Sequence, residues 1–550
     1  MDRHQKYEKG SQRDTVSWDK DGHICIMRFS MRYMASIVVL CLGFGLFFNS
    51  CIKVPYSTDT SHILSFSKDT ILFDTVFTTI GSVTHYFTVR NPYDDALLID
   101  EISLEGLSSS AYRINVDGVG VDENGSPITM VEDVTILGGD SIFVFVEVTV
   151  DPDNSLSPFI EEDSIKFVTN TNEQYVNLLA WGRNAYFHYQ PGNWANSYDN
   201  EDNILSPNET WQSDKPHVIY GQLLVDLNYI LTIDEGAEIY AHDGSGIWVR
   251  GGTINVNGTL ENKVVFQGDR LDASYQDKPG QWGLDFPLEF DFEGETFYYT
   301  LNRGGIWLDR AKDCNINHAV IKNATSGIWV DSVSIDAQNY SLKLTNTEIN
   351  NHSSIGLISQ GGHIHGVNNL VYDCGEACGA FTLGGEIVMH LSTFANYWSA
   401  GTTVRQGPSV YINDWYESAG GNRQPRPFNS NTEFRNCIIW GNNAETDDHD
   451  ELTANLDSVM IYDNPLFRAC AVDVQDDDFP QQILSEDCTL DITPPFESTT
   501  GNKDFRISSG SSIWQGISSI PPFNSSDVTL DIIGTPRSTN SPDRGCYERN

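Results

Sequence analysis

A glycine followed by a short group of apolar residues returns four times in the middle of this chain. The repeats begin at Gly305, Gly327, Gly356 and Gly379, at intervals of 22, 29 and 23 residues. Each interval holds two or three short runs in which apolar and polar residues alternate, which is the pattern of β-strands. Strands this short cannot bury an apolar face alone, so each must stack on the same strand of the next repeat. The pattern therefore predicts a solenoid with one coil per interval.

Asparagine and glycine recur where the coils must turn. Corners between strands need unusual backbone angles, which these two residues adopt at least cost. The asparagines near such corners are Asn317, Asn323, Asn346, Asn350, Asn351, Asn368 and Asn369. Cysteines precede comparable runs at Cys314, Cys374 and Cys437, and we expect them to point inward.

This stretch resembles the right-handed parallel β-helix proteins of bacterial cell envelopes, most strongly over residues 240–445. The resemblance implies an all-β chain with a β-helix over residues 217–463. It specifies a fold and leaves the activity open.

The segments before and after the solenoid have different sequence patterns. Residues 60–185 contain six to eight alternating runs separated by turn residues, which predicts an antiparallel β-sandwich. Through Phe-Thr-Val-Arg-Asn at 87–91 and Gly-Gly-Asp-Ser-Ile at 138–142, it resembles an immunoglobulin-like module of bacterial surface lipoproteins, which implies a spacer. Residues 186–216 have the composition of a linker or an opening cap.

The last segment, residues 464–550, is predicted to cap the solenoid. Its closing part resembles an end module of bacterial β-helix surface proteins. The residues that carry this resemblance are Asp531, Gly534, Arg537, Asp543, Gly545 and Glu548. A cap would cover the last coil, whose open edge would otherwise pair with another chain.

The N-terminal region, residues 1–50, reads as an extension followed by a lipoprotein signal peptide. Residues 34–48 are an unbroken apolar run, which is short for a membrane span and suits a signal-peptide core. Translation would then start at Met27, Met31 or Met34. Ser50 directly precedes Cys51, which resembles a lipoprotein box of the Bacteroidetes type. The resemblance implies that Cys51 is lipidated, that residues 51–59 are a tether, and that the protein sits in the outer membrane, facing either the surface or the periplasm.

The charge of the chain argues against some partners. It carries 33 basic and 76 acidic side chains, a formal net charge of −43. Such a surface repels phosphate backbones, so we expect no nucleic-acid partner.

Carboxylates with a nearby cation are the first candidates for catalysis. Asp309, Arg310 and Asp313 lie in one predicted coil and Asp331 in the next. If the protein is a polysaccharide lyase or glycoside hydrolase, Asp309, Arg310 and Asp331 are the residues expected to act in a groove of the β-helix. The competing interpretation is that they are solvated corners.

Metal ligands are sparse. His363 and His365 are two residues apart, so on a strand they share a face and would hold a metal ion if a third ligand approached. The acidic runs at 447–450 and 476–478 are weak candidates for calcium, because they lack the spacing of a calcium loop. No other cofactor is expected.

Seven cysteines follow Cys51, an odd number that cannot all pair internally. In an oxidising envelope the expected disulfides are Cys374 with Cys378 and Cys470 with Cys488.

Aromatic residues gather in the excursion at residues 269–302, which interrupts the coils. Flat rings stack on sugar faces, so Trp282, Phe286, Tyr298 and Tyr299 are candidate glycan-binding residues. The competing interpretation is that they pack the excursion onto the solenoid. The sequence thus favours a non-catalytic envelope lipoprotein that binds glycans or proteins, with a polysaccharide-cleaving enzyme as the alternative. It does not indicate the oligomeric state.

Overall fold

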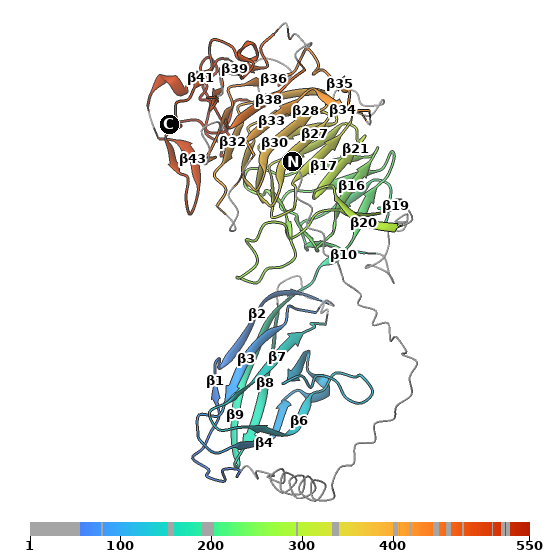
Figure 1. Cartoon of the computed structure of the whole chain (residues 1–550), viewed down its shortest axis with the longest axis vertical. Coiled ribbons are helices and arrows are strands. Elements are labelled where there is room, and N and C mark those ends of the chain that lie inside the picture. Colours follow the sequence, from blue (N-terminus) through green and yellow to red (C-terminus); the bar gives the residue numbers. More distant parts are fainter. Residues whose placement is uncertain are drawn as a thin grey trace, which may run out of the picture.

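The protein is all-β, with an N-terminal sandwich followed by a parallel β-helix (Figure 1). The structure is a computed structural model. It describes residues 55–78, 81–151, 159–189, 203–292, 295–332, 340–399, 405, 407–418, 420–443, 450–457, 462, 464–475, 478–508, 510–518, 523 and 528–549. Among these residues, no helix is long and apolar enough to cross a membrane.

Two packed sheets make up the sandwich. The first sheet has the order β2 (Thr70–Phe77), β9 (Asn172–Arg183), β8 (Phe159–Thr169), β4 (Leu97–Leu104) and β6 (Met130–Ile136). The second has the order β1 (Ser65–Phe66), β3 (His85–Arg90), β7 (Ser141–Val148) and β5 (Tyr112–Val116), and η1 (Leu107–Ser109) is a short 3₁₀ turn. Strict alternation in β7 turns Ile142, Val144 and Val146 into the shared core. The immunoglobulin-like identity of this sandwich stays a prediction.

In the described part of the chain, the solenoid consists of three parallel sheets, here called sheets 1, 2 and 3. Sheet 1 has the order β10 (Tyr186–His188), β12 (His217–Ile219), β15 (Glu238–Ala241), β18 (Val264–Gly268), β23 (Ala319–Lys322), β26 (Glu348–His352), β29 (Leu370–Cys374), β32 (Thr393–Asn396), β37 (Ile438–Gly441), β40 (Ala471–Val472) and β41 (Thr489–Leu490). Sheet 2 has the order β11 (Glu209–Trp211), β14 (Ile230–Ile233), β17 (Thr253–Asn257), β22 (Cys314–Asn317), β25 (Leu342–Thr345), β28 (His363–Val367), β31 (Glu386–His390), β36 (Glu433–Arg435) and β39 (Phe467–Arg468). Sheet 3 has the order β13 (Gln222–Val225), β16 (Gly246–Arg250), β21 (Ile306–Asp309), β24 (Ile328–Asp331), β27 (Ile355–Gln360), β30 (Ala377–Thr382), β33 (Val410–Asn413) and β38 (Leu452–Asn455).

The coils stack in register, so like residues form columns inside the solenoid. In sheet 3, Ile247 pairs with Ile306, which pairs with Ile328, and all three are fully buried. Cys314, Cys374 and Cys437 also lie in the interior, as the sequence predicts. The repeat of the sequence is thus a repeat of the core.

The repeated glycines serve close packing. We expected glycine to turn the corners, but Gly305, Gly327, Gly356 and Gly379 are not in the left-handed region. A Cβ at Gly305 would come within 2.5 Å of the Trp282 ring, and one at Gly327 within 2.4 Å of the carbonyl oxygen of Gly356. Only glycine leaves room there for the neighbouring coil.

Asparagines do turn the corners. Asn323, Asn346, Asn351 and Asn368 all have positive φ, between 51° and 66°. Their side chains also bridge coils, since the Asn346 amide donates to Asn317 Oδ1 at 3.0 Å and the Asn368 amide donates to Asn346 Oδ1 at 3.2 Å. This ladder satisfies polar groups that the tight turns would otherwise leave unpaired.

The C-terminal tail lies along the outer side of sheet 1 (Figure 1). Parallel stacking continues to Leu490, past the predicted boundary at residue 463. The 3₁₀ turn η2 (Gln481–Ile483) comes shortly before Leu490. Beyond Leu490 come β42 (Phe496–Ser498), β43 (Asp504–Ile507) and the 3₁₀ turn η3 (Ser512–Trp514). The tail packs against outward side chains such as Leu370 and Trp440. Because these side chains are apolar, the outer face of sheet 1 must be covered, in addition to the last coil of the solenoid.

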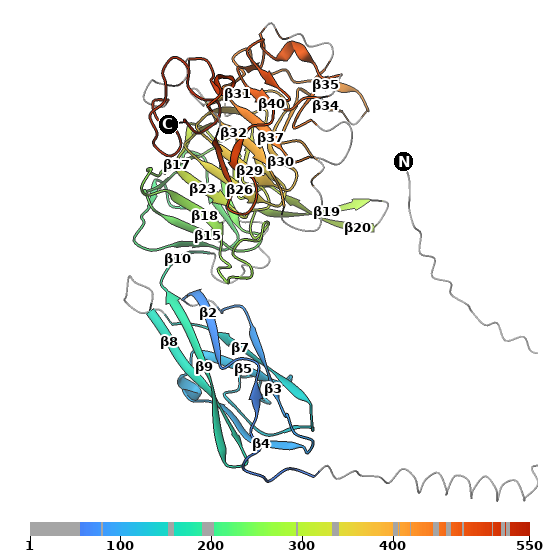
Figure 2. The same ribbon diagram turned by 90° about the vertical axis from the view of Figure 1, so that its left-hand side faces the viewer.

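Two hairpins interrupt the coils in the part of the solenoid that the structure describes. β19 (Asp285–Phe292) and β20 (Glu295–Asn302) form an antiparallel hairpin that projects from the solenoid (Figure 2). β34 (Trp415–Glu417) and β35 (Arg423–Pro425) form a shorter one. The longer hairpin occupies the predicted excursion.

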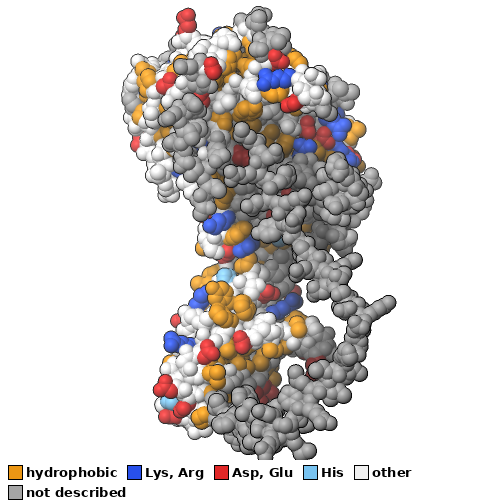
Figure 3. Space-filling model, in the orientation of Figure 1, with side chains coloured by type: hydrophobic (Ala, Val, Ile, Leu, Met, Phe, Trp, Pro, Cys, Tyr) orange, Lys and Arg blue, Asp and Glu red, His pale blue; other side chains and the backbone are white. Residues whose placement is uncertain are grey.

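The sandwich joins the solenoid at a narrow waist (Figure 3). The Arg183 guanidinium donates to both carboxylate oxygens of Glu238, at 2.7 and 2.9 Å, and the Phe77 ring packs on Tyr240. A bidentate ion pair and an aromatic contact thus connect the two units.

Replacing Asn369 with Ala should destabilise the solenoid. The Asn369 side chain is fully buried, donates to the Leu344 carbonyl at 2.9 Å and accepts from the Thr347 amide at 3.1 Å. Leaving these backbone groups unpaired costs about 1–3 kcal/mol. Urea unfolding would measure the loss. Asn315→Ala on the outward side of β22 is the control, and equal stability of the two variants would contradict the prediction.

Candidate functional site

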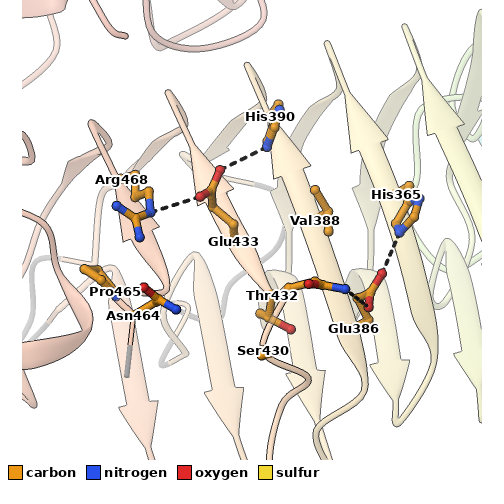
Figure 4. A pocket seen from close by; sticks show the side chains of 11 residues that line it. His365, Glu386, Val388, His390, Ser430, Thr432, Glu433, Asn464, Pro465 and Arg468 are labelled. Carbon is orange, nitrogen blue, oxygen red and sulfur yellow. Dashed lines mark hydrogen bonds and ion pairs between the residues drawn. The ribbon is translucent and has the colours of Figure 1, made fainter. Parts of the chain in front are cut away.

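A pocket of about 400 Å³ lies on the outer face of sheet 2 (Figure 4). Strands β28, β31, β36 and β39 supply its floor, because alternate residues of a strand point away from the solenoid core. Polar side chains dominate the lining, with Val388 and Pro465 as apolar contacts. The lining residues are His365, Glu386, Val388, His390, Ser430, Asn431, Thr432, Glu433, Asn464, Pro465 and Arg468.

Glu386 is held from both sides at one end of the pocket. His365 Nε2 lies 2.9 Å from Glu386 Oε1, and the Asn431 amide donates to Oε2 at 3.1 Å. The hydrogen bond with His365 lowers the pKa of Glu386, burial opposes this, and Asn431 lowers the pKa further. Glu386 is therefore ionised at neutral pH.

Glu433 is the centre of the other end. Arg435 Nε lies 2.5 Å and His390 Nε2 3.3 Å from its Oε1, and Arg468 Nε lies 3.0 Å from its Oε2. Burial raises the pKa of Glu433, but the hydrogen bonds with His390 and Arg435 outweigh it and lower the pKa to about 2. Burial also lowers the pKa of His390, whose side chain is 1% exposed.

This arrangement is suited to holding a polyhydroxylated ligand. Carboxylates accept hydrogen bonds, and amide, guanidinium and hydroxyl groups donate them. Because their partners fix these groups in place, the pocket is organised before a ligand arrives.

The predicted catalytic residues come together on a different face, sheet 3. Asp309 and Asp331 are direct partners in the pairing of β21 with β24. Arg310 Nε donates to Asp309 Oδ1 at 2.9 Å. Burial raises the pKa of Asp331, Arg303 lowers it and the nearby Asp309 raises it, for a net increase. The structure thus places one arginine-paired carboxylate beside one that protonates more easily.

A tryptophan column on sheet 3 was missed by the sequence reasoning. Trp248, Trp307 and Trp329 pair along β16, β21 and β24, and the first two rings stack at 5.0 Å. The Arg303 guanidinium lies 5.3 Å from the Trp307 ring and 4.8 Å from the Trp329 ring. The repeated Gly-Ile-Trp at 246, 305 and 327 was the available signal. Because these ring faces meet one another and arginines, the column mainly stabilises sheet 3.

Trp282 is not a ligand-binding residue, which corrects the prediction. Its side chain is only 1% exposed, and its Nε1 donates to the Lys322 carbonyl at 2.8 Å. The ring fills the solenoid core beside Gly305, where no glycan can reach it. Phe286, Tyr298 and Tyr299 lie in the β19–β20 hairpin, and their side chains are outside what the structure describes.

Of the predicted histidine pair, His365 lines the pocket and His363 lies beside it on β28. His363 pairs with Glu386 across β28 and β31, and His365 contacts the same carboxylate. Among the described residues, no group of three or more His, Cys, Asp and Glu side chains is placed to hold a metal ion. Residues 444–449 and 476–477, which include most of the two acidic runs considered for calcium, lie outside the described residues.

The predicted disulfides are not formed in this structure. All seven described cysteines are free thiols, although Cys374 neighbours Cys378 and Cys470 neighbours Cys488. Cys374, Cys378 and Cys470 are fully buried in the core, where the thiols pack as small apolar groups and burial raises the pKa of Cys378 and Cys470. Cys51, the predicted lipidation site, lies outside the described residues.

Most of the pocket was not predicted from the sequence. Glu386, His390, Glu433 and Arg468 lie on three strands that are distant in the chain. The sequence gives only a weak indication of these residues. Polar residues alternate with apolar ones in Glu-Ile-Val-Met-His and Thr-Glu-Phe-Arg-Asn, which predicts strands with polar outer faces and no particular site. Only the register of the coils shows that these positions are neighbours.

No known protein family matches this chain, and no curated protein matches it. Among solved structures, a family 123 glycoside hydrolase from Clostridium perfringens, studied for glycolipid glycan hydrolysis, is 11% identical with a TM-score of 0.17. That match covers 25% of this chain and 32% of the hydrolase, so the chain spans about a third of that protein's length.

Two further similar structures are the catalytic domain of a GH87 α-1,3-glucanase. The complex with nigerose is 12% identical with a TM-score of 0.16, and covers 70% of this chain and 81% of that domain. The complex with tetrasaccharides is 10% identical with a TM-score of 0.13, and covers 77% and 73%. At such scores the likeness says nothing about activity, and the function of this chain rests on its own side chains.

Replacing Glu433 with Gln should destabilise the protein at neutral pH by about 3 kcal/mol, the equivalent of lowering a pKa from 4.5 to about 2. Because the folded pKa is the lower one, this stabilisation is complete above about pH 4.5 and is lost as the pH falls towards 2. Urea unfolding at several pH values would measure it. The variant should lose less stability than the unmodified chain across this window, and identical pH profiles would contradict the prediction.

Proposed function

We propose that this protein is a non-catalytic envelope protein whose pocket on sheet 2 binds a glycan. The observation that carries the proposal is the pair of ionised carboxylates, Glu386 and Glu433, each fixed by neighbouring donors in a pocket of about 400 Å³. That volume lies within the roughly 300–1,000 Å³ of ordinary ligand sites.

The chemistry of the lining supports a sugar as the ligand. Each sugar hydroxyl both donates and accepts, so it pairs with a carboxylate and with an amide or guanidinium at once. Glu386 and Asn431 form such a combination at one end, and Glu433 and Arg468 form another. Pro465, which is partly exposed, offers apolar surface to the C–H groups of a sugar ring.

The protonation states favour binding over cleavage. Most glycosidases need one carboxylic acid with a raised pKa to protonate the leaving group. The pKa values of both pocket carboxylates are lowered, so neither donates a proton at neutral pH. The two-carboxylate mechanism of most glycosidases would therefore lack its acid in this pocket.

The N-terminal segment supports a place for this protein in the cell envelope. The apolar run at 34–48 and the Ser50-Cys51 pair support a lipid anchor at Cys51 in the outer membrane of a bacterium. In this arrangement the sandwich is a spacer that holds the solenoid away from the lipid.

Replacing Arg468 with Ala should weaken glycan binding about tenfold or more, because a hydrogen bond to a charged group contributes about 1.5–3 kcal/mol. A glycan array probed with the purified chain would identify the ligand. The same ligand would then be titrated against the variant, with released reducing or unsaturated ends measured in parallel.

Arg250→Ala is the matched control, because Arg250 is similarly exposed and also pairs with a carboxylate, Asp226, but lies on sheet 3. It should bind like the unmodified chain. Equal binding by the Arg468 variant, or release of product through the sheet 2 pocket, would overturn the proposal.

A second candidate function is cleavage of a polysaccharide on sheet 3. The observation in its favour is the Asp309 and Asp331 pair, in which Arg310 holds one carboxylate and the pKa of the other is raised. In this hypothesis Asp331 is the proton donor and Asp309 is the second, arginine-paired carboxylate.

Asp331→Asn distinguishes the two functions. If sheet 3 is catalytic, this variant should lose product release by at least about a hundredfold, the usual contribution of general acid catalysis, while keeping its affinity for the polysaccharide. If neither the unmodified chain nor the variant releases product from any glycan that binds, the second candidate is rejected.

A further inference from the structure

Three aromatic rings form an exposed cluster on the sandwich. Tyr86, Phe143 and Phe145 are 54%, 45% and 36% exposed, although side chains of this kind are mostly buried. Tyr86 in β3 is the direct partner of Phe145 in β7, and Phe143 lies two residues along β7 on the same side. The ring centroids are 5.9 to 6.2 Å apart, so the three rings touch as one surface.

Cations surround this ring cluster. Lys68 Nζ lies 6.0 Å from the Tyr86 ring, and Arg90 and Arg113 are exposed on the outward side of β3 and β5. Among the described residues, none of these three cations takes part in an ion pair. Two carboxylates lie among these side chains. Glu147 faces outward on β7 opposite Arg113 and accepts a hydrogen bond from Thr84. The exposed Asp117 directly follows β5, and its backbone N–H donates to the Phe143 carbonyl at 2.9 Å. The three cations therefore outnumber these two carboxylates, on a chain whose formal net charge is −43.

We propose that this outer face of the sandwich binds an acidic glycan, one that carries uronate carboxylates. The rings offer stacking surface to the C–H faces of sugars, and the three cations, which form no ion pair with another described residue, would bind the uronate carboxylates. Long-range repulsion from the rest of the chain does not prevent this, because charges more than about 10 Å away are largely screened at about 0.1 M salt.

The face is distinct from the sheet 2 pocket. It belongs to β3, β5 and β7 of the sandwich, whereas the pocket belongs to the solenoid. Substitutions therefore test the two sites separately. The sandwich would then capture an acidic polymer as well as act as a spacer.

Binding of the purified full chain to immobilised polygalacturonate tests the proposal, with neutral galactan as the comparison polymer. The double variant Phe143→Ala, Phe145→Ala should bind about tenfold more weakly, since an aromatic contact contributes up to about 1.5 kcal/mol. Arg90→Gln with Arg113→Gln should also weaken binding, and both substitutions are at exposed positions where folding is little affected. Raising the salt from about 0.1 M to about 0.5 M should weaken binding by the unmodified chain.

Tyr175→Ala is the matched control, because Tyr175 is 42% exposed on β9, in the other sheet of the sandwich. It should bind polygalacturonate like the unmodified chain. Absence of binding to polygalacturonate, equal binding to galactan, or full binding by both the ring and the arginine variants would overturn the proposal. Dimerisation of the unmodified chain that the ring substitutions abolish would overturn it too, since the face would then meet a second copy.

Discussion

Each strand of the solenoid finds its backbone hydrogen-bond partners in the coils before and after it. Strands of four or five residues, such as β21 and β24, have no stable partner within their own coil, so the stack forms only when neighbouring coils hold one register. That requirement explains the columns of isoleucine inside, the glycines where backbones meet closely, and the asparagine ladder at the corners. Asn369 meets the same requirement, because its side chain forms hydrogen bonds with backbone groups that the turn would otherwise leave unpaired.

Stacking in register requires apolar residues at the inward positions of each strand. The outward positions are not restricted in this way, so their chemistry differs from sheet to sheet. Sheet 1 presents apolar side chains and is covered by the C-terminal tail. Sheet 2 presents alternating acidic and basic groups and carries the pocket. Sheet 3 presents the tryptophan column and the Asp309 and Asp331 pair. One scaffold thus offers three surfaces of different chemistry, and their outward side chains are free to differ because the core does not depend on them.

Ion pairing decides which carboxylates keep their charge. Glu433 has two arginines and a histidine around it and is ionised to low pH, whereas Asp331 is buried beside a second carboxylate and protonates more readily. A tightly paired carboxylate is a stable acceptor for sugar hydroxyls and a poor proton donor. This contrast is the physical basis on which the proposed binding on sheet 2 is distinguished from the candidate cleavage on sheet 3.

The sequence by itself determined the repeating core. Apolar alternation, glycine spacing and corner asparagines are local properties, so they predicted an all-β solenoid after a sandwich and the inward cysteines. The sites were decided by tertiary structure. Trp282 looks like an exposed ring in the sequence, yet the coil closes around it, and the face of the sandwich carries exposed rings that alternation alone would not single out. His365, Glu386, His390, Glu433 and Arg468 meet because coils of unequal length, from 22 to 29 residues where the repeat is clearest, are brought into register. Which outward residues become neighbours depends on how each loop is accommodated, and that information exists only once the chain has folded.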